Sequence, residues 1–267
     1  SKAFHFRAHP RAIDFLRAAK IDCVTLANNH VLDYGTDALI ECLALLDRAG
    51  IKRTGAGASL AEALMPAVVD LPQGRLGVVS LTDNEPEWEA GEKKPGTHYI
   101  AYDAKGLVEP YRSRLAQLLK QVRSQADLVV VSAHVGPNWG PPSVAMRMLA
   151  HQIVDLGADL YWGHSNHTAQ GIELYKGKAI LYSTGDFIDD YAVDSAERND
   201  LSFLFIVELE RGRIARILLY PVCIEDLYVR LAKDKEMEFL SRTMRAKCKV
   251  FGTAMTGEGQ VGTISVK

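Results

Sequence analysis

Residues 127–164 of this chain read DLVVVSAHVGPNWGPPSVAMRMLAHQIVDLGADLYWGH, and their pattern indicates the fold class. The stretch opens with an apolar run rich in valine, passes through a Gly/Pro loop and an amphipathic segment, and closes on a second apolar run. Buried strands of parallel sheets are continuous apolar runs of this kind, and a helix connects two of them. The stretch therefore predicts a β-loop-α-β unit of an α/β protein.

The same order of strands and helices is expected upstream. The apolar run CVTLA at residues 23–27 is predicted to be a buried strand between two amphipathic helices. The first helix begins at Pro10, which suits a first helical turn, and extends to about Lys20. The second extends from Thr36, its expected N-cap, to Gly50, which closes it. Further expected elements are a short helix in SLAEAL, a hairpin of AVVDLP and RLGVVSLT, and helices in PYRSRLAQLLKQVRSQ and KDKEMEFLSRTMRAK.

Beyond residue 171 the pattern changes to two-stranded ribbons. Two pairs of apolar runs are joined at glycines, with turns expected at Lys176–Gly177 and Arg211–Gly212. Residues 83–98 hold two prolines and two glycines with little periodicity, so they are predicted to form a long loop or a mobile lid. A single domain, with a mixed sheet or two facing sheets, is expected over residues 1–267.

Composition excludes several classes of protein. The chain has a net charge of −2, which gives no support for a basic face that binds nucleic acid or an anionic membrane. No apolar stretch reaches the roughly 20 residues that span a bilayer. The four cysteines lie far apart and form no CxxC pair, so neither a zinc ribbon nor a redox motif is indicated. We expect a cytoplasmic protein, or an exported or membrane-associated one if a segment precedes Ser1.

Polar side chains that can bind a metal follow three of the apolar runs. These side chains are Asn29, His30, His134, His164 and His167. In an open α/β sheet, the loops beyond the carboxyl ends of the strands line one crevice, so distant loops can converge there. Imidazole and amide groups in such a crevice indicate a divalent metal site. Mixed nitrogen and oxygen ligands favour Mn, Fe or Zn.

Each of these motifs has an ordinary explanation when it is taken alone. Consecutive asparagines are common in loops, because asparagine caps helices and tolerates a left-handed backbone. His164 and His167 are also explained as two hydrogen-bonded surface histidines, and Asp33 as a helix cap instead of the partner of a histidine. Trp88 and Trp139 are candidates for lining a pocket, with packing as the alternative. The run GAGAS lacks the lysine of a P-loop and the third glycine of a dinucleotide site, so no organic cofactor is expected.

The ordered set of motifs resembles a known family. LANNHVLDYG, GIKRTGAGAS with EALMP, VVVSAHVGPNW and ADLYWGHSNHTAQGIELYKGKAILYSTGDF are similar in order and spacing to CapA-like proteins of poly-γ-glutamate capsule synthesis. The resemblance covers residues 4–222, and residues 223–267 are a C-terminal helix and strand extension. It implies the four-layer αββα sandwich of calcineurin-like metallophosphoesterases, with a two-metal centre at the strand ends.

The resemblance also implies roles for individual residues. Asn29, His134, His164 and His167 correspond to metal ligands. His30 corresponds to the histidine of the asparagine-histidine motif, which more often faces the substrate. His30 or His167 would stabilise a developing oxyanion or protonate the leaving group.

The chain departs from the family in its acidic residues. Family members begin with a strand that ends in Gly-Asp, followed by an Asn-Leu-Glu motif, and neither occurs here. Without these carboxylates, neutral ligands would leave the charge of two divalent ions uncompensated. We therefore expect that the chain lacks its natural N-terminal strand; the alternative is one weakly held ion. Asp186 replaces the usual asparagine and is predicted to be an added ligand or general base, with a turn-capping role before Phe187 as the alternative.

Three functions agree with this pattern. The first is a metal-dependent hydrolase that acts on a phosphoester or on an amide polymer such as poly-γ-glutamate, with catalytic residues His30, His167, Asp33 and Asp186. The second is a non-catalytic CapA-like component that binds acidic polymer or a partner in capsule synthesis. The third is a peptide-modifying enzyme of the epimerase type. In each case we expect the ligand to be a small molecule, a peptide or an acidic polymer.

Overall fold

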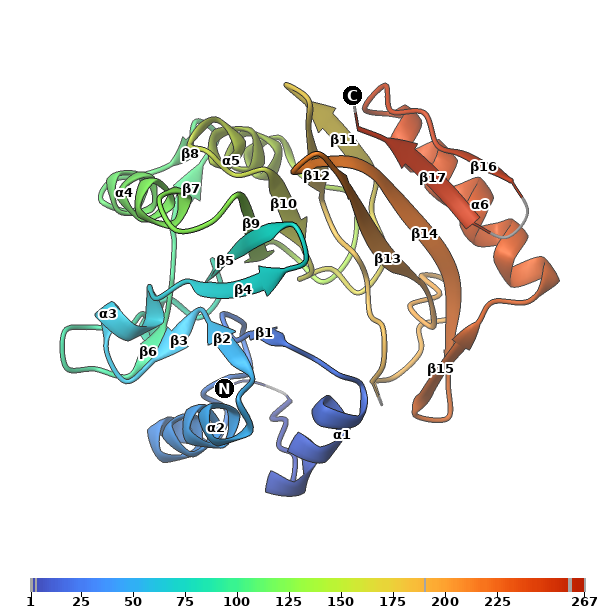
Figure 1. The fold of residues 1–267 in the computed structure, drawn as a ribbon. Helices are drawn as coiled ribbons and strands as arrows, with labels where there is room; N and C mark the ends of the chain where they lie inside the picture. The colour runs from blue at the N-terminus through green and yellow to red at the C-terminus, as the bar shows by residue number, and fades with distance from the viewer. Residues whose placement is uncertain (1, 3, 190, 259–260, 267) are drawn as a thin grey trace. The chain divides into compact units, whose positions relative to one another are not determined.

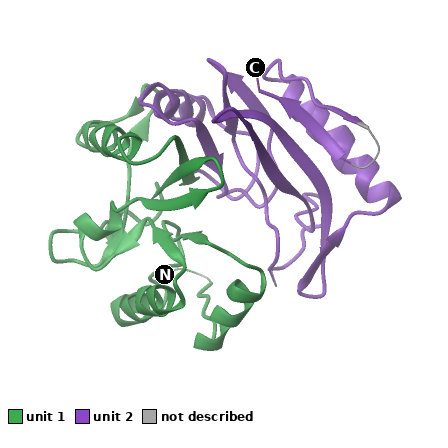
Figure 2. Cartoon of the chain, in the orientation of Figure 1, with its two compact units in different colours: residues 1–134 green, residues 135–267 purple. Residues whose placement is uncertain are grey.

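The computed structural model describes residues 2, 4–189, 191–258 and 261–266, which Figure 1 shows as a ribbon. The chain divides into two compact units, residues 1–134 and residues 135–267 (Figure 2). Each unit combines helices with strands, so the predicted α/β class is confirmed. The four-layer arrangement and the single domain stay predictions.

Unit 1 contains two parallel strands, β5 and β9, whose carboxyl ends lie side by side. β4 pairs antiparallel with β5, and β5 pairs parallel with β9, so that Thr82 lies opposite His134 at the ends of β5 and β9. A separate parallel pair joins β1 to β2. The elements of unit 1 are η1 (Pro10–Ala12), α1 (Ile13–Ala18), β1 (Cys23–Thr25), α2 (Gly35–Ala49), β2 (Lys52–Thr54), β3 (Ala56–Gly57), α3 (Leu60–Ala63), β4 (Ala67–Leu71), β5 (Gly74–Thr82), η2 (Pro86–Trp88), β6 (Gly96–Thr97), β7 (Tyr102–Asp103), β8 (Gly106–Leu107), α4 (Tyr111–Arg123) and β9 (Leu128–His134).

Two predictions for unit 1 are wrong in detail. β1 has only three residues, all half-buried, where the sequence predicts a buried strand over residues 23–27. Helix α2 begins at Gly35, so Thr36 lies inside its first turn and is not the N-cap. Gly35 has a φ of 80°, which glycine adopts without steric cost, and the helix begins two residues before Asp37, the first helical residue that a cap at Thr36 would give. At the other end Gly50 closes α2 in the left-handed conformation, as predicted.

The irregular segment 83–98 is anchored at its downstream end. β6 pairs with β3, and Thr97 and His98 are buried. The Nδ1 atom of His98 lies 2.9 Å from the carbonyl oxygen of Ser80. Burial lowers the pKa of His98 to about 4, so this histidine is a neutral part of the interior. A lid role for the rest of the segment stays a prediction.

Among its described residues, unit 2 holds two α-helices and two groups of strands. β12 lies between β10, to which it is parallel, and β11, to which it is antiparallel. The second group has the order β13-β14-β17-β16, with β15 also paired to β14. Both predicted hairpins are present, and their turn residues have positive φ angles. The elements of unit 2 are α5 (Val144–Asp155), β10 (Leu160–Gly163), β11 (Ile172–Tyr175), β12 (Lys178–Leu181), β13 (Leu201–Glu210), β14 (Arg213–Glu225), β15 (Tyr228–Leu231), α6 (Asp234–Lys249), β16 (Thr256–Glu258) and β17 (Val261–Ser265).

Within the described ranges of the chain, no helix has both the length and the apolar character that crossing a membrane requires.

Packing on helix α2 can be tested with two neighbouring residues. Leu39 is fully buried in a cluster with Leu43 and Ala56, whereas Ile40 is 40% exposed. We expect Leu39→Ala to lower the free energy of unfolding by about 2–5 kcal/mol, because it removes apolar contacts and leaves a cavity. The matched control Ile40→Ala should change it by no more than about 0.5 kcal/mol. Urea unfolding followed by circular dichroism measures both, and equal losses would contradict this packing.

Candidate functional site

The loop after β10 carries two of the predicted site histidines and leaves the strand through a close contact. A Cβ atom on Gly163 would lie 2.2 Å from the carbonyl oxygen of Tyr182, so only glycine fits there. The carbonyl oxygen of Gly163 accepts a hydrogen bond of 2.9 Å from the backbone N–H of Thr184. The loop with His164 and His167 therefore starts from a rigid position beside the segment after β12.

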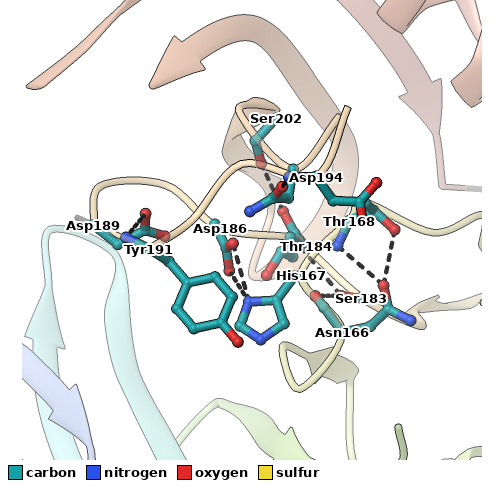
Figure 3. A network of polar contacts seen from close by, with 12 residues as sticks. Asn166, His167, Thr168, Ser183, Thr184, Asp186, Asp189, Tyr191, Asp194 and Ser202 are labelled. Atoms are coloured by element: carbon teal, nitrogen blue, oxygen red, sulfur yellow. Dashed lines mark hydrogen bonds and ion pairs between the residues drawn. The ribbon is translucent and has the colours of Figure 1, made fainter. Parts of the chain in front are cut away.

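The side chain of Asn166 holds this loop in one conformation. Its Oδ1 atom accepts hydrogen bonds from the backbone N–H of Thr168 at 3.0 Å and from the Thr168 hydroxyl at 2.9 Å. Its Nδ2 atom donates to the carbonyl oxygen of Gly140 at 2.9 Å. Figure 3 shows Asn166 beside Thr168 and Ser183, whose hydroxyl donates to the Asn166 carbonyl oxygen at 2.8 Å. Because Asn166 is buried, breaking this network would leave polar groups without partners.

The same loop is tied to the Gly/Pro loop that follows His134 in sequence. Besides the bond from Asn166, the Ser165 hydroxyl donates to the carbonyl oxygen of Gly136 at 2.8 Å, and the His167 N–H donates to that of Asn138 at 2.9 Å. These bonds place the ring of Trp139 5.3 Å from the imidazole of His167. Trp139 therefore contributes to the surroundings of a site histidine, although its sequence neighbour is His134.

His167 forms a histidine-carboxylate pair with Asp186. Its Nδ1 atom lies 2.9 and 3.0 Å from the two carboxylate oxygens of Asp186. The ring of Tyr191 stacks on the imidazole, with 4.8 Å between ring centroids and an interplanar angle of 6° (Figure 3). The hydrogen bond that His167 donates to Asp186 raises the pKa of His167, although burial opposes this. Asp186 therefore favours the imidazolium form and leaves Nε2 as the ring nitrogen for chemistry.

The surroundings of His164 and Asp189 favour the neutral form of each side chain. Burial lowers the pKa of His164 to about 4, so its imidazole is neutral at pH 7. A neutral imidazole has a lone pair that suits a metal ligand. Burial and the charge of Asp186 raise the pKa of Asp189, against the hydrogen bond from the backbone N–H of Tyr191. Unit 2 thus joins a neutral histidine, a protonatable histidine and two carboxylates on neighbouring loops.

Unit 1 contains a second histidine-carboxylate pair. The Nδ1 atom of His30 lies 2.7 Å from Asp33, which also accepts hydrogen bonds from the Lys2 ammonium at 2.5 Å and the Phe6 N–H at 2.8 Å. Burial raises the pKa of Asp33, but hydrogen bonds from Lys2, Phe6 and His30 lower it further, to below its ordinary value. Asp33 is therefore ionised and orients His30. Lys2 also donates to the carbonyl oxygen of Asn29.

His134 lies at the end of β9 with partners that the sequence did not indicate. Its carbonyl oxygen accepts hydrogen bonds from the Thr82 hydroxyl at 2.9 Å and from the Asn84 amide at 3.3 Å. The Asn84 amide also donates to the Asp83 carboxylate at 2.7 Å. Because β5 and β9 are parallel, Asp83 and Asn84 follow the end of a strand beside His134. Their position after the apolar run RLGVVSLT is the signal that could have found them.

A cavity of about 800 Å³ lies in unit 1 beside His30. One wall is the segment with Phe6 and Leu16, and the other is the α2 side with Tyr34 and Leu45. The ring of Phe6 lies 4.4 Å from the His30 imidazole, so the cavity and the histidine share a wall.

The structure joins His30 to Asp33 and His167 to Asp186, as hydrogen-bonded pairs within their units. Among the residues that the structure describes, no three His, Cys, Asp or Glu side chains form a group that could hold a metal ion. The role of Asn29, His134, His164 and His167 as metal ligands stays a prediction. Sequence reasoning missed Tyr191, which has no motif of its own, and Asn166, whose local bond to the Thr168 N–H is typical of an Asx turn.

The chain is similar to known proteins in sequence and in fold. Residues 1–191 match the family described as "Bacterial capsule synthesis protein PGA_cap". A "probable polyglutamine synthesis accessory protein" of Mycobacterium tuberculosis is 34% identical over 261 residues, covering 92% of this chain and 67% of that protein. The "PGA biosynthesis protein CapA" of Bacillus subtilis is 27% identical, covering 84% of this chain and 57% of that protein. The crystal structure of a hypothetical protein from Thermus thermophilus shares the fold, with a TM-score of 0.50 and 18% identity over 84% of this chain and 81% of that one.

The pair in unit 2 predicts a measurable pKa change. We expect Asp186→Asn to lower the pKa of His167, because the neutral amide no longer stabilises the imidazolium ion. Titration of the His167 ring signals by NMR measures this shift. The control Glu238→Gln changes an exposed carboxylate on α6 and should leave the titration unchanged. An unaltered His167 pKa in Asp186→Asn would contradict the pairing.

The pair in unit 1 predicts a pH-dependent loss of stability. The folded-state pKa of Asp33 is lowered, so its contribution is present above the unfolded pKa of about 3.9 and is lost as pH falls through the folded value. We expect Asp33→Asn to cost about 1–3 kcal/mol at pH 7, with the difference from wild type shrinking below about pH 4. Urea unfolding across this range measures it. The exposed Asp70→Asn is the control, and a cost that persists at acid pH would count against an ionised Asp33.

Proposed function

This chain belongs to the bacterial capsule synthesis family PGA_cap, and from that membership we propose that it is a metal-dependent hydrolase. The proposed substrate is a phosphoester or an amide polymer such as poly-γ-glutamate. The family and the names of its relatives support a place in capsule polymer synthesis. The observation that carries the proposal of hydrolysis is the His167–Asp186 pair, with the rings of Tyr191 and Trp139 near the imidazole.

The pair is suited to acid-base catalysis. Asp186 accepts a hydrogen bond from Nδ1 of His167, so the imidazole presents Nε2 in a fixed orientation. Carboxylates orient catalytic histidines in the same way. Because Asp186 raises the pKa of His167, a larger fraction of the histidine carries a proton near neutral pH. In that state Nε2–H donates a proton to the leaving group. In the neutral state Nε2 accepts a proton from water.

The surroundings restrict where His167 can act. Tyr191 stacks on the imidazole, and the ring of Trp139 lies at 5.3 Å. These aromatic rings limit rotation of the histidine and reduce its contact with water. His30, whose Nδ1 atom is held by Asp33, is a second candidate for stabilising a developing negative charge, by its correspondence to the family motif.

The proposed cofactor is a divalent ion, with Mn, Fe or Zn preferred for nitrogen and oxygen ligands. His164 fits such a ligand, since its imidazole is neutral at pH 7. The ligand roles of Asn29 and His134 rest on their correspondence to the family motifs alone. When bound, a divalent ion supplies Lewis-acid activation of water and of the substrate oxygen.

Two variants separate the roles of the unit 2 histidines. We expect His167→Ala to lower kcat by about 10²–10⁴-fold, because it removes the proton donor, and the metal content of this variant tests whether His167 is also a ligand. We expect His164→Ala to reduce both metal content and turnover. Hydrolysis of poly-γ-glutamate and of an aryl phosphoester gives the rates, and elemental analysis gives the metal content. The control His5→Ala changes an exposed histidine and should alter neither.

The outcomes distinguish hydrolysis from its absence. Unchanged turnover after complete removal of metal would contradict a metal-dependent reaction. Stoichiometric metal with no release of product from either substrate would contradict hydrolysis. Incorporation of deuterium at a peptide α-carbon without cleavage would identify an epimerase-type reaction instead.

A second candidate function is a non-catalytic component that binds acidic polymer. Two observations favour it. Among the described residues, no three His, Cys, Asp or Glu side chains form a group that could hold a metal ion. The Mycobacterium relative is named an accessory protein. Calorimetric titration with poly-γ-glutamate distinguishes this candidate, which requires saturable binding while the polymer length stays constant.

A further inference from the structure

Strand β13 lies at one end of its sheet in unit 2 and has an open edge. It spans 10 residues, Leu201–Glu210, and pairs with β14 along its length (Figure 1). It stands first in the order β13-β14-β17-β16. Within residues 2, 4–189, 191–258 and 261–266, no strand pairs with its other edge. Such an edge is a template for another strand, unless charge, proline or a bulge blocks it.

The ladder between β13 and β14 shows which backbone groups face this open edge. The Ile224 N–H donates to the carbonyl oxygen of Asp200 at 2.7 Å, so even-numbered residues next to it bond to β14. Pro221, which has no N–H, lies opposite Phe203 and agrees with this alternation. Phe203, Phe205 and Val207 therefore direct their N–H and C=O groups toward the open edge.

The open part of β13 has none of the features that block strand addition. Residues 201–207 contain no charge and no proline, and the bulge in the ladder comes later, between Glu208 and Leu209. Leu204 and Ile206 are 41% and 40% exposed on the face that the inward phenylalanines do not occupy. An uncharged strand of this length with exposed aliphatic side chains is typical of an association surface.

We propose that β13 pairs antiparallel with β13 of a second copy of this chain, across a twofold axis at Phe205. In this register Phe203 faces Val207 of the second copy and Phe205 faces itself, so each facing pair can exchange two hydrogen bonds. Leu204 lies opposite Ile206 of the second copy, which buries exposed aliphatic side chains together. The same strand is its own complement, as an isologous interface requires.

The charges at the ends of β13 agree with a second copy as the occupant. Glu208 forms an ion pair with Arg216, and Asp200 forms one with Arg198 at 2.7 Å. In the proposed register Glu208 faces Ser202 of the second copy, and Asp200 faces Glu210 only at the outer ends, where Arg198 already pairs with Asp200. Arg198 and Arg216 compensate Asp200 and Glu208 within each chain, and the uncharged centre is what the copies share.

Charge substitutions at Leu204 and Ile206 test the partner and the register together. Sedimentation velocity on the full chain should show a dimer that dissociates on dilution. We expect Leu204→Lys/Ile206→Lys to raise the dimer Kd by at least about 100-fold, because like charges then face each other. We expect Leu204→Lys/Ile206→Glu to restore dimerisation, since each lysine then faces a glutamate of the other copy. The control Val250→Lys changes a residue that is 76% exposed elsewhere and should remain dimeric.

Circular dichroism of each variant separates loss of pairing from loss of folding. A monomeric wild type at every concentration would overturn the proposal, and binding of an extended peptide by that monomer would assign the edge to another protein. A folded Leu204→Lys/Ile206→Glu variant that stays monomeric would also overturn it, as would a dimer that survives Leu204→Lys/Ile206→Lys. None of these outcomes depends on whether the chain hydrolyses a substrate.

Discussion

The buried amide of Asn166 determines the course of the loop that carries the candidate chemistry in unit 2. A buried amide must satisfy its donor and acceptor groups locally, and Asn166 does so with Thr168 on its own loop and Gly140 on another. These bonds join two loops that come from different strand ends. Gly163 adds a steric condition, since its backbone lies against Tyr182. His167 is thus positioned by groups that take no part in chemistry themselves.

Histidines of this chain acquire different properties from different surroundings. Burial makes His164 a neutral imidazole, whereas the carboxylate of Asp186 stabilises the charged form of His167 three residues later. In unit 1, Asp33 orients His30 and is itself held ionised by Lys2 and a backbone N–H. Burial therefore favours a neutral imidazole with a free lone pair, whereas a neighbouring carboxylate favours an imidazole that carries a proton.

Much of the fold could be predicted from the sequence because its signals are local. The turns at Lys176–Gly177 and Arg211–Gly212 need a left-handed backbone, and the structure has it there. The β10 strand and the α5 helix follow from continuous apolar and amphipathic patterns. The prediction of Thr36 as N-cap is wrong because the start of a helix depends on the preceding turn, and here the helix already begins at Gly35. The burial of β1 was overestimated because burial depends on what packs against a strand, which a short apolar run does not contain.

The motifs of the candidate site could be predicted from the sequence, but the hydrogen-bonded pairs that its side chains form could not. The sequence by itself determined the α/β class, the strand-end positions of the histidines, and the family, because apolar periodicity and motif order are written along the chain. Only the tertiary structure decided that Asp186 binds His167, that Tyr191 and Trp139 flank it, and that Asp83 and Asn84 lie beside the end of β9. It also decided that, among the strands the structure describes, β14 alone pairs with β13. The reason is physical: hydrogen bonds, stacking and burial act over a few ångströms, and residues far apart in sequence come within that range only when the chain has folded.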